Sequence, residues 1–225
     1  MEKGVIKEII GWDVVNWARA IYFWEQETPV KSGNLSCMEL GASFGGLSLW
    51  MALNNNQVLC TDINGPEEGA HYIHKRYSCH RKIEYRALSA TSIPYENRFD
   101  IIAFKSILGG ISHSGRDELK IKAISEVHKA LKPGGMLLFA ENLEGSSIHR
   151  YFRRKYGTRG WNYLKFSEID RIFNNFRELK YTTAGFFGCM GRNESQRSIL
   201  GSLDRVVEKL VSEKNRYIII GVAKK

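Results

Sequence analysis

The sequence predicts an α/β fold in which helices cover both faces of a mostly parallel β-sheet. Short apolar segments alternate along the chain with longer segments of helical spacing, a pattern typical of βαβ units. The clearest unit begins with an apolar strand at 38–40 that stops abruptly at Gly41. The small residues Ala42, Ser43, Gly45 and Gly46 follow, and apolar residues of helical spacing resume over 47–53. With 225 residues, the chain is suited to a single domain with a sizeable core.

The glycine-rich turn at 41–46 is predicted to hold a ligand. Glycine reaches positive φ without a Cβ clash and lets a ligand lie directly on the backbone. A second strand at 57–61 ends at Asp62, and an acid at this position can accept hydrogen bonds from the ribose hydroxyls of a nucleotide. Glu39 lies inside the first strand, where a buried charge is unfavourable unless it has a partner or a function.

The other elements follow from the same periodicities. Apolar residues on nearly every face of 1–27 predict a helix packed on the edge of the core or, alternatively, an aromatic lid over the ligand. The segment Lys132-Pro133-Gly134-Gly135 is expected to end the helix before it, because proline cannot continue a helix and glycine supplies a left-handed cap. Further helices are expected at 67–77, at 117–131 and within an insertion at 193–215, and further strands at 83–87, 99–104, 136–140, 179–187 and 217–223.

Composition narrows the class of protein and the partner. Hydrophobic residues make up 43% of the chain and charged residues 25%, which is ordinary for a globular protein in water. No apolar run approaches the roughly 20 residues needed to span a bilayer, and the first residues are too polar for a signal peptide, so we expect a cytoplasmic protein. The four cysteines are scattered without a C-x-x-C pair and are expected to be reduced. The net charge of +9 predicts an anionic partner: nucleic acid, a nucleotide-linked sugar, a phospholipid surface or a phosphorylated carrier.

In these motifs the chain resembles the class I S-adenosylmethionine (SAM)-dependent methyltransferases. The first motif of that family reads roughly acid-x-Gly-x-Gly-x-Gly, which is matched here by Glu39, Gly41, Ser43 and Gly45, with Ser43 in place of the middle glycine. The Leu-Lys-Pro-Gly-Gly-x-Leu segment around 131–137 strengthens the resemblance. A pyrophosphate-binding NAD site fits less well, because its third glycine would lie two places further along.

The resemblance is firm over 35–140 and loose elsewhere. It implies a Rossmann-like sheet of seven strands, in which the last strand runs antiparallel between the fifth and the sixth. We divide the single methyltransferase domain, 1–225, into an N-terminal helical lid or cap at 1–34, a SAM-binding half at 35–142 and an acceptor-side half at 143–225.

The resemblance also implies the cofactor site. Ser89 stands where the family often has an aspartate that contacts adenine, and a hydroxyl can still meet the adenine amino group. A metal is not expected, because Lys105 occupies the region of the first Mg²⁺-binding aspartate of some family members, and Glu141-Asn142 supplies only half of the remaining set. The predicted SAM-binding residues are Glu39, Gly41, Ala42, Ser43, Gly45, Asp62, Ile63, Ser89, Ala90 and Lys105.

The chemistry of SAM directs the choice of catalytic residues. Methyl transfer from a sulfonium is an in-line displacement, so alignment and exclusion of water are the main tasks. A hydroxyl acceptor must also lose a proton to a general base. We predict His113, which follows the fourth strand, as this base, with Glu141 after the fifth strand as the second candidate.

A basic, aromatic segment at 146–165 is predicted to bind the acceptor, through His149, Arg150, Arg153 and Arg154. Together with 140–149 and 216–218, it resembles methyltransferases encoded with bacterial surface-polysaccharide genes. This implies a hydroxyl of a sugar, on an anionic small molecule or a carrier-linked glycan, as the acceptor. The alternatives are an RNA methyltransferase, which we favour less, a small-molecule O- or N-methyltransferase, and a SAM-binding protein without catalysis. Peripheral contact with a membrane and the oligomeric state stay open.

Overall fold

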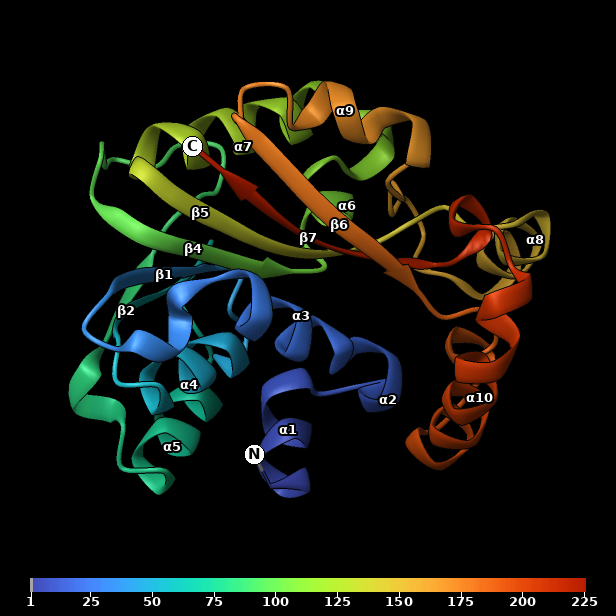
Figure 1. Cartoon of the computed structure of the whole chain (residues 1–225), viewed down its shortest axis with the longest axis horizontal. Coiled ribbons are helices and arrows are strands. Elements are labelled where there is room, and N and C mark those ends of the chain that lie inside the picture. Colours follow the sequence, from blue (N-terminus) through green and yellow to red (C-terminus); the bar gives the residue numbers. More distant parts are fainter. Residues whose placement is uncertain (1) are drawn as a thin grey trace.

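The computed structural model describes residues 2–225 and is built around one seven-stranded sheet (Figure 1). The strand order is β3-β2-β1-β4-β5-β7-β6. The first five strands pair in parallel, whereas β7 runs antiparallel between β5 and β6, which confirms the predicted sheet. The strands are β1 (Ser36–Leu40), β2 (Gln57–Asp62), β3 (Ile83–Ala87), β4 (Phe99–Lys105), β5 (Leu131–Asn142), β6 (Glu178–Ala184) and β7 (Ile218–Lys224).

Helices cover both faces of this sheet. In Figure 1, α3, α4 and α5 lie below it, α7 and α9 lie above it, and α8 and α10 stand at the right-hand end. No helix within residues 2–225 is both long enough and apolar enough to cross a bilayer. The helices are α1 (Lys3–Ile10), α2 (Val14–Trp17), α3 (Arg19–Glu27), α4 (Gly46–Leu53), α5 (Glu68–Arg76), α6 (Leu108–Ile111), α7 (Asp117–Ala130), α8 (Ser147–Tyr156), α9 (Ile169–Ile172) and α10 (Glu194–Val207).

The central strands are apolar on both sides because each face of the sheet is covered. In β4, Ile101 and Ala103 pack into the core shared with α3 and α4, whereas Ile102 and Phe104 pack into the core shared with α7 and α9. Successive side chains of a strand point to opposite faces, so a doubly covered strand reads as a continuous apolar run. This is why β4 could be recognised in the sequence.

The N-terminal segment forms three helices that pack on the core. Gly11 and Asp13 have positive φ angles, 81° and 45°, and separate α1 from α2. Trp17 and Trp24 are fully buried, and the Trp24 indole donates a hydrogen bond to the carbonyl of Gly221 in β7 at 3.0 Å. The aromatic residues of this segment are therefore largely core residues.

The proline–glycine segment before the fifth strand differs from the sequence-based expectation. The helix α7 already ends at Ala130, and β5 begins at Leu131. Phe99 pairs with Leu131 and Ile101 pairs with Met136, so residues 132–135 bulge out of the strand. Gly134, with φ 77°, turns the chain within this bulge and does not cap the helix. The prediction was wrong because pairing with β4 extends the chain before the proline is reached.

Candidate active site

A cavity of about 500 Å³ lies outside the carboxyl ends of β1, β2 and β4. This is the edge where ligands bind in open α/β sheets. Several predicted cofactor residues line the cavity, namely Gly41, Asp62, Ile63, Ser89 and Ala90. The turn after β4 supplies the facing wall through Ser106 and Ile107.

The glycine turn after β1 is shaped by close packing. Gly41, Ser43 and Gly45 all have positive φ angles, 65°, 46° and 70°. A Cβ on Gly41 would come within 2.4 Å of Ile107, and a Cβ on Gly45 within 2.5 Å of the His74 ring. Both positions therefore need glycine for the backbone conformation and for space. Ser43, which takes the place of the family's middle glycine, adopts the same left-handed region.

Asp62 joins the end of β2 to this turn. One carboxylate oxygen accepts a hydrogen bond from the backbone N–H of Ser43 at 2.9 Å, and the other accepts from Ile63 at 2.7 Å. A carboxylate oxygen has two lone pairs, so each oxygen can still accept a hydroxyl. The carboxylate thus fixes the turn and keeps capacity for the two hydroxyls of a ribose.

Glu39 lies beneath the turn and does not line the cavity. Its two oxygens accept hydrogen bonds from the backbone N–H groups of Leu47, at 3.1 Å, and Ser48, at 2.7 Å, at the start of α4. Burial raises the pKa of this carboxyl to about 7, and the two N–H donors oppose that rise. The predicted cofactor residue therefore shapes the turn from below.

Glu141 has the same arrangement on the other side of the cavity. One of its oxygens accepts from the N–H groups of Ile107, at 2.6 Å, and Leu108, at 2.8 Å, which begin α6. Burial raises its pKa to about 7. The side chain therefore holds the wall that Ile107 contributes, and Glu141 lines neither this cavity nor the second one.

Lys105 is the cation of this buried region. Its ammonium lies 4.9 Å from the ring centre of Trp17 and 5.4 Å from that of Trp12. Burial lowers its pKa to about 8, while nearby Glu141 and Glu39 raise it. The side chain points to the N-terminal helices and is not among the residues that line the cavity. Within residues 2–225, no three His, Cys, Asp or Glu side chains form a group that could hold a metal ion.

His113 lies in an exposed 3₁₀ turn, His113–Gly115, outside the lining of both cavities. Its Nε2 is 3.1 Å from the carbonyl oxygen of Arg159, and its Nδ1 is 2.8 Å from the Ser114 hydroxyl. Both ring nitrogens therefore have partners, and the predicted role of His113 as a base stays a prediction.

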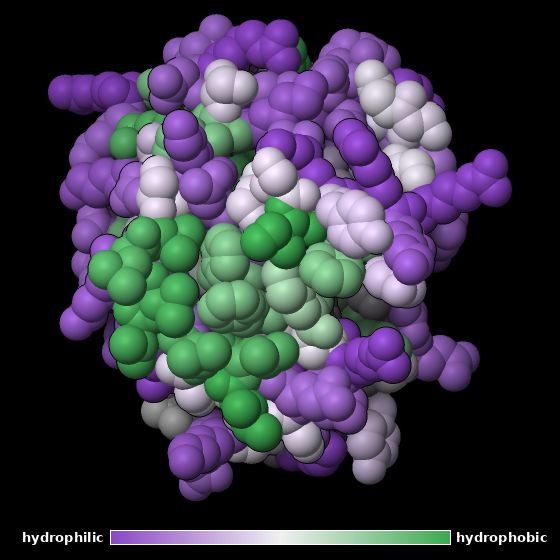
Figure 2. All heavy atoms as spheres, turned by 90° about the vertical axis from the view of Figure 1, so that its right-hand side faces the viewer, coloured by the Kyte–Doolittle hydropathy of each residue, from purple (hydrophilic) through white to green (hydrophobic). Residues whose placement is uncertain are grey.

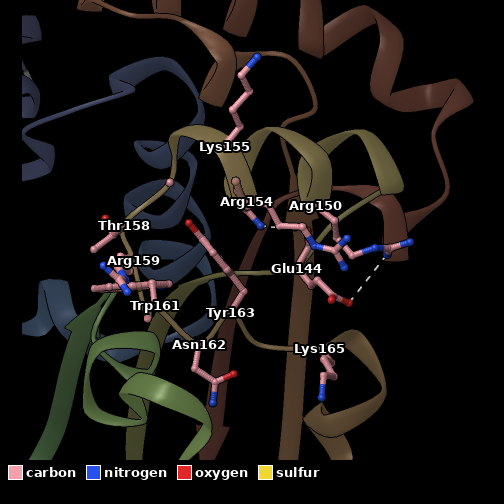
Figure 3. Close-up of a pocket in the computed structure, with 13 residues that line it drawn as sticks. Glu144, Arg150, Arg154, Lys155, Thr158, Arg159, Trp161, Asn162, Tyr163 and Lys165 are labelled. Carbon is pink, nitrogen blue, oxygen red and sulfur yellow. Dashed lines mark hydrogen bonds and ion pairs between the residues drawn. The ribbon is translucent and has the colours of Figure 1, made fainter.

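A second cavity, of about 610 Å³, is strongly cationic (Figure 3). Four arginines, two lysines and one carboxylate line it: Arg150, Arg153, Arg154, Arg159, Lys155, Lys165 and Glu144. Trp161 lines both this cavity and the first, so its side chain is a wall that the two cavities share. It packs tightly on Gly109, where a Cβ would come within 2.1 Å of the indole nitrogen.

The predicted acceptor residues divide into two groups. Arg150, Arg153 and Arg154 line the cationic cavity, whereas His149 does not. His149 is buried, faces the Phe186 carbonyl with Nε2 at 2.7 Å and accepts from the Ser146 N–H at 3.0 Å, so it caps α8. Trp161 was missed as a site residue. Trp161 lies in the predicted acceptor segment 146–165 but was not among the acceptor residues named from the sequence, and the pair Gly109-Gly110 makes room for its ring.

Comparison with known proteins agrees with this geometry. A family model described as "Methyltransferase domain" matches residues 38–139. The structures that resemble the chain include phosphoethanolamine N-methyltransferase 2 of Haemonchus contortus, which was solved in complex with phosphomonomethylethanolamine and S-adenosylhomocysteine. Its sequence is 17% identical, the TM-score is 0.65, and the match covers 93% of this chain and 52% of that one. A putative methyltransferase of Bacillus halodurans has 18% identity and a TM-score of 0.58, with coverage of 91% and 98%. A putative O-methyltransferase of Nostoc punctiforme has 14% identity and a TM-score of 0.62, with coverage of 92% and 56%.

Residues 38–139 therefore match a methyltransferase domain, and the structures that share the fold include methyltransferases in complex with SAM or S-adenosylhomocysteine. The chain spans about half the length of the Haemonchus chain, 52%. A search of curated proteins found no match. SAM binding in the first cavity stays a prediction; among the residues that line this cavity, Asp62 offers acceptors for a ribose.

We expect Asp62→Ala to weaken binding of S-adenosylhomocysteine by about tenfold or more, because it removes charged hydrogen-bond acceptors worth about 1.5 kcal/mol or more. Isothermal titration calorimetry measures the change. Asp62→Asn keeps the size of the side chain, so its affinity for S-adenosylhomocysteine should lie between those of the wild type and Asp62→Ala. Asp170→Ala, at an exposed position in α9, is the control. An unchanged affinity in Asp62→Ala would remove the central assignment of this site.

The buried carboxyl of Glu141 predicts a pH dependence of stability. Its pKa rises from 4.5 to about 7 on folding, so the folded chain keeps a proton that the unfolded chain releases. This contribution is complete below the lower value and is lost as the pH rises through about 7. The side chain of Glu141→Gln stays neutral at every pH. As the pH rises from 4.5 to about 7, the free energy of unfolding measured in urea should therefore fall less for this variant than for the wild type. Exposed Glu118→Gln is the control, and equal pH slopes for Glu141→Gln and the wild type would contradict the prediction.

Proposed function

We propose that this protein transfers the methyl group of SAM to an acceptor that carries a phosphate, and that the acceptor atom is a hydroxyl oxygen of a sugar on an activated or carrier-linked glycan. The observation that carries the proposal is the cationic cavity, which adjoins the cofactor cavity through Trp161. A phosphate held among the cations would leave the rest of the acceptor beside the methyl group.

The charges of the second cavity favour an anion over a neutral acceptor. Three of its cations, Arg154, Lys155 and Arg159, make no ion pair within residues 2–225, and their charged groups are free to bind. Arginine can bind phosphate through two parallel hydrogen bonds, which gives both affinity and orientation. By contrast, Arg153 donates to the carbonyls of Leu143 and Glu144 and lies over the Tyr163 ring, so it shapes the cavity.

The chain's own residues would align the reaction. SAM supplies an activated methyl group, so the protein needs to position two groups and exclude water. Glu39 and Glu141 hold the two turns that form the cofactor cavity, through backbone N–H groups. Trp161 packs on Gly109 and Gly110 and lines both cavities. This apolar ring would keep bulk water from the path of transfer.

A phosphorylated acceptor agrees better with the size of the cationic cavity than RNA does. A nucleic-acid enzyme usually spreads positive charge along an extended track, whereas these cations converge on one cavity. The Haemonchus enzyme was crystallised with phosphomonomethylethanolamine, a small phosphorylated molecule, although at this identity it shares only the fold with the present chain. The resemblance of 140–149 to methyltransferases of polysaccharide gene clusters supports a sugar as the carrier of the hydroxyl.

We expect Arg154→Ala/Arg159→Ala to raise the KM for the acceptor by about tenfold or more, because each lost charged hydrogen bond is worth about 1.5–3 kcal/mol. The affinity for S-adenosylhomocysteine should not change. The assay follows label from SAM into nucleotide sugars, carrier-linked glycans and total RNA. The control is Lys122→Ala/Arg177→Ala, at exposed positions away from both cavities.

Each outcome of this assay has a consequence. Label in a phosphorylated or carrier-linked sugar supports the proposal. Label in RNA alone, with affinity that falls steeply as salt rises, would replace the sugar by RNA. An acceptor KM that is the same in the wild type and in Arg154→Ala/Arg159→Ala would show that the cavity does not bind the acceptor.

We also propose His113 as the base that removes the proton of a hydroxyl acceptor. Its ring packs against Gly160, the residue before Trp161. We expect His113→Ala to lower kcat by about 10²-fold, the usual range for general-base catalysis, and to leave cofactor affinity intact. Exposed His80→Ala is the control. If His113→Ala stays active and Glu141→Gln is inactive, Glu141 is the better candidate; if both stay active, the reaction needs neither as a base.

A further inference from the structure

The helix α10 turns an apolar stripe toward solvent. The stripe consists of Ile199, Leu203 and Val206 in α10 and of Leu210 in the 3₁₀ turn Glu208–Leu210 that follows, and these residues are 72%, 47%, 68% and 89% exposed. The opposite side of the helix is firmly packed, because Gly201 lies against Val15 and the Asp204 carboxylate accepts a hydrogen bond from Asn16 at 2.9 Å. The stripe is therefore a fixed feature of the surface. An amphipathic helix normally buries such a stripe.

The helix α8 continues the apolar surface. Its exposed side carries Ile148, Tyr151, Phe152 and Tyr156. The segment between β6 and α10 joins the two helices, since His149 in α8 is hydrogen-bonded to the Phe186 carbonyl and the Phe187 N–H donates to Asp204 in α10 at 2.6 Å. Figure 2 views this side of the molecule and shows a broad apolar area bordered by hydrophilic side chains. We call these eight side chains the α8–α10 face.

Positive charges are interspersed with the α8–α10 face. Arg205 and Lys209 lie in and just after α10, are exposed, and make no ion pair within residues 2–225. On α8, Arg154 and Lys155 are likewise exposed and without an ion pair. The net charge of the whole chain is +9. Apolar side chains interspersed with unpaired cations are typical of helices that lie in the interface of an anionic membrane.

We propose that the α8–α10 face docks on the surface of an anionic lipid bilayer. Charge complementarity selects this occupant: anionic headgroups would neutralise the unpaired cations while the apolar side chains enter the interface. A second copy of the chain fits poorly, because a two-fold contact would bring two faces that both carry unpaired positive charges together.

This inference rests on the proposed function in one respect, the nature of the acceptor. Four residues of α8, namely Arg150, Arg153, Arg154 and Lys155, line the cationic cavity, so the same helix serves the cavity and the docking face. A bilayer at that face would present an acceptor carried on a lipid phosphate close to the cavity. The acceptor class is thus a phosphate-bearing glycan anchored in the membrane.

The test is flotation of the full chain with vesicles of phosphatidylcholine alone and of phosphatidylcholine with phosphatidylglycerol. We expect binding to the anionic vesicles that falls as salt rises, and much weaker binding to the neutral ones. The variant Ile199→Ser/Val206→Ser/Leu210→Ser should reduce binding to anionic vesicles by about tenfold or more, since it removes three apolar side chains from the interface. Tyr72→Ser, at a side chain that is 68% exposed on α5, is the matched apolar control.

A second variant tests the charges separately. Arg205→Glu/Lys209→Glu should reduce binding to anionic vesicles and leave the weak binding to neutral vesicles unchanged. The control is Lys75→Glu/Arg81→Glu, at exposed positions on α5 and shortly after it. All variants should keep wild-type affinity for S-adenosylhomocysteine, because the α10 stripe lies outside both cavities.

Three results would overturn the proposal. The first is no binding of the wild type to anionic vesicles at low salt. The second is equal vesicle binding by the wild type and the α10 serine variant. The third is a dimer in light scattering that the serine variant converts to a monomer while vesicle binding is unchanged, which would assign the face to a second copy. Retained S-adenosylhomocysteine affinity with no vesicle binding would refute docking alone and leave the methyltransferase assignment standing.

Discussion

The cofactor cavity depends on two buried carboxylates at the carboxyl ends of strands. Glu39 in β1 holds the N–H groups of Leu47 and Ser48, and Glu141 in β5 holds those of Ile107 and Leu108. Burying a carboxylate is unfavourable by several kcal/mol unless hydrogen bonds and an opposite charge compensate. Here each acid satisfies two backbone donors that helix geometry leaves unpaired at the start of α4 and α6. The turns on both sides of the cavity are thereby fixed, and the contact between Gly41 and Ile107 can be close.

Lys105 connects these two acids electrostatically. Its charge lies near both carboxylates and over the rings of Trp12 and Trp17, which belong to the N-terminal segment. The N-terminal helices therefore take part in the charge balance beneath the cavity, although they are remote from the glycine turn in sequence. Lys105 was predicted as a cofactor contact because it lies at the carboxyl end of β4. In the fold its side chain takes the sheet face opposite to Phe104, as the alternation of a strand requires.

Local patterns were sufficient for the individual strands and for the turn after β1, and the family resemblance supplied the order of the sheet. The apolar runs, the positive-φ turn and Asp62 are properties of short segments, and the parallel pairing of the strands follows from their alternation. The roles of the other residues depend on contacts with segments that are distant in the sequence. From its position in the sequence, His149 was predicted to bind the acceptor. In the fold its ring is hydrogen-bonded to the Phe186 carbonyl and to the Ser146 N–H at the start of α8. Trp161 became a site residue only because Gly109 leaves room for its ring. The stripe on α10 showed the period of a buried helix, yet the side with Gly201 and Asp204 is the one that packs.

The basic segment at 146–165 shows why residue type alone could not assign the acceptor site. Its members share charge, but the backbone carbonyls of Leu143 and Glu144 engage Arg153 and make it part of the scaffold. The segment is also attached to α7, where Asn162 donates to Asp117 at 2.7 Å, and to α6 through Trp161. Because the segment is held in this way, Arg154 and Arg159 do not have to stabilise the fold. The cations available for an acceptor are those that the fold leaves unpaired, and this division exists only in the folded chain.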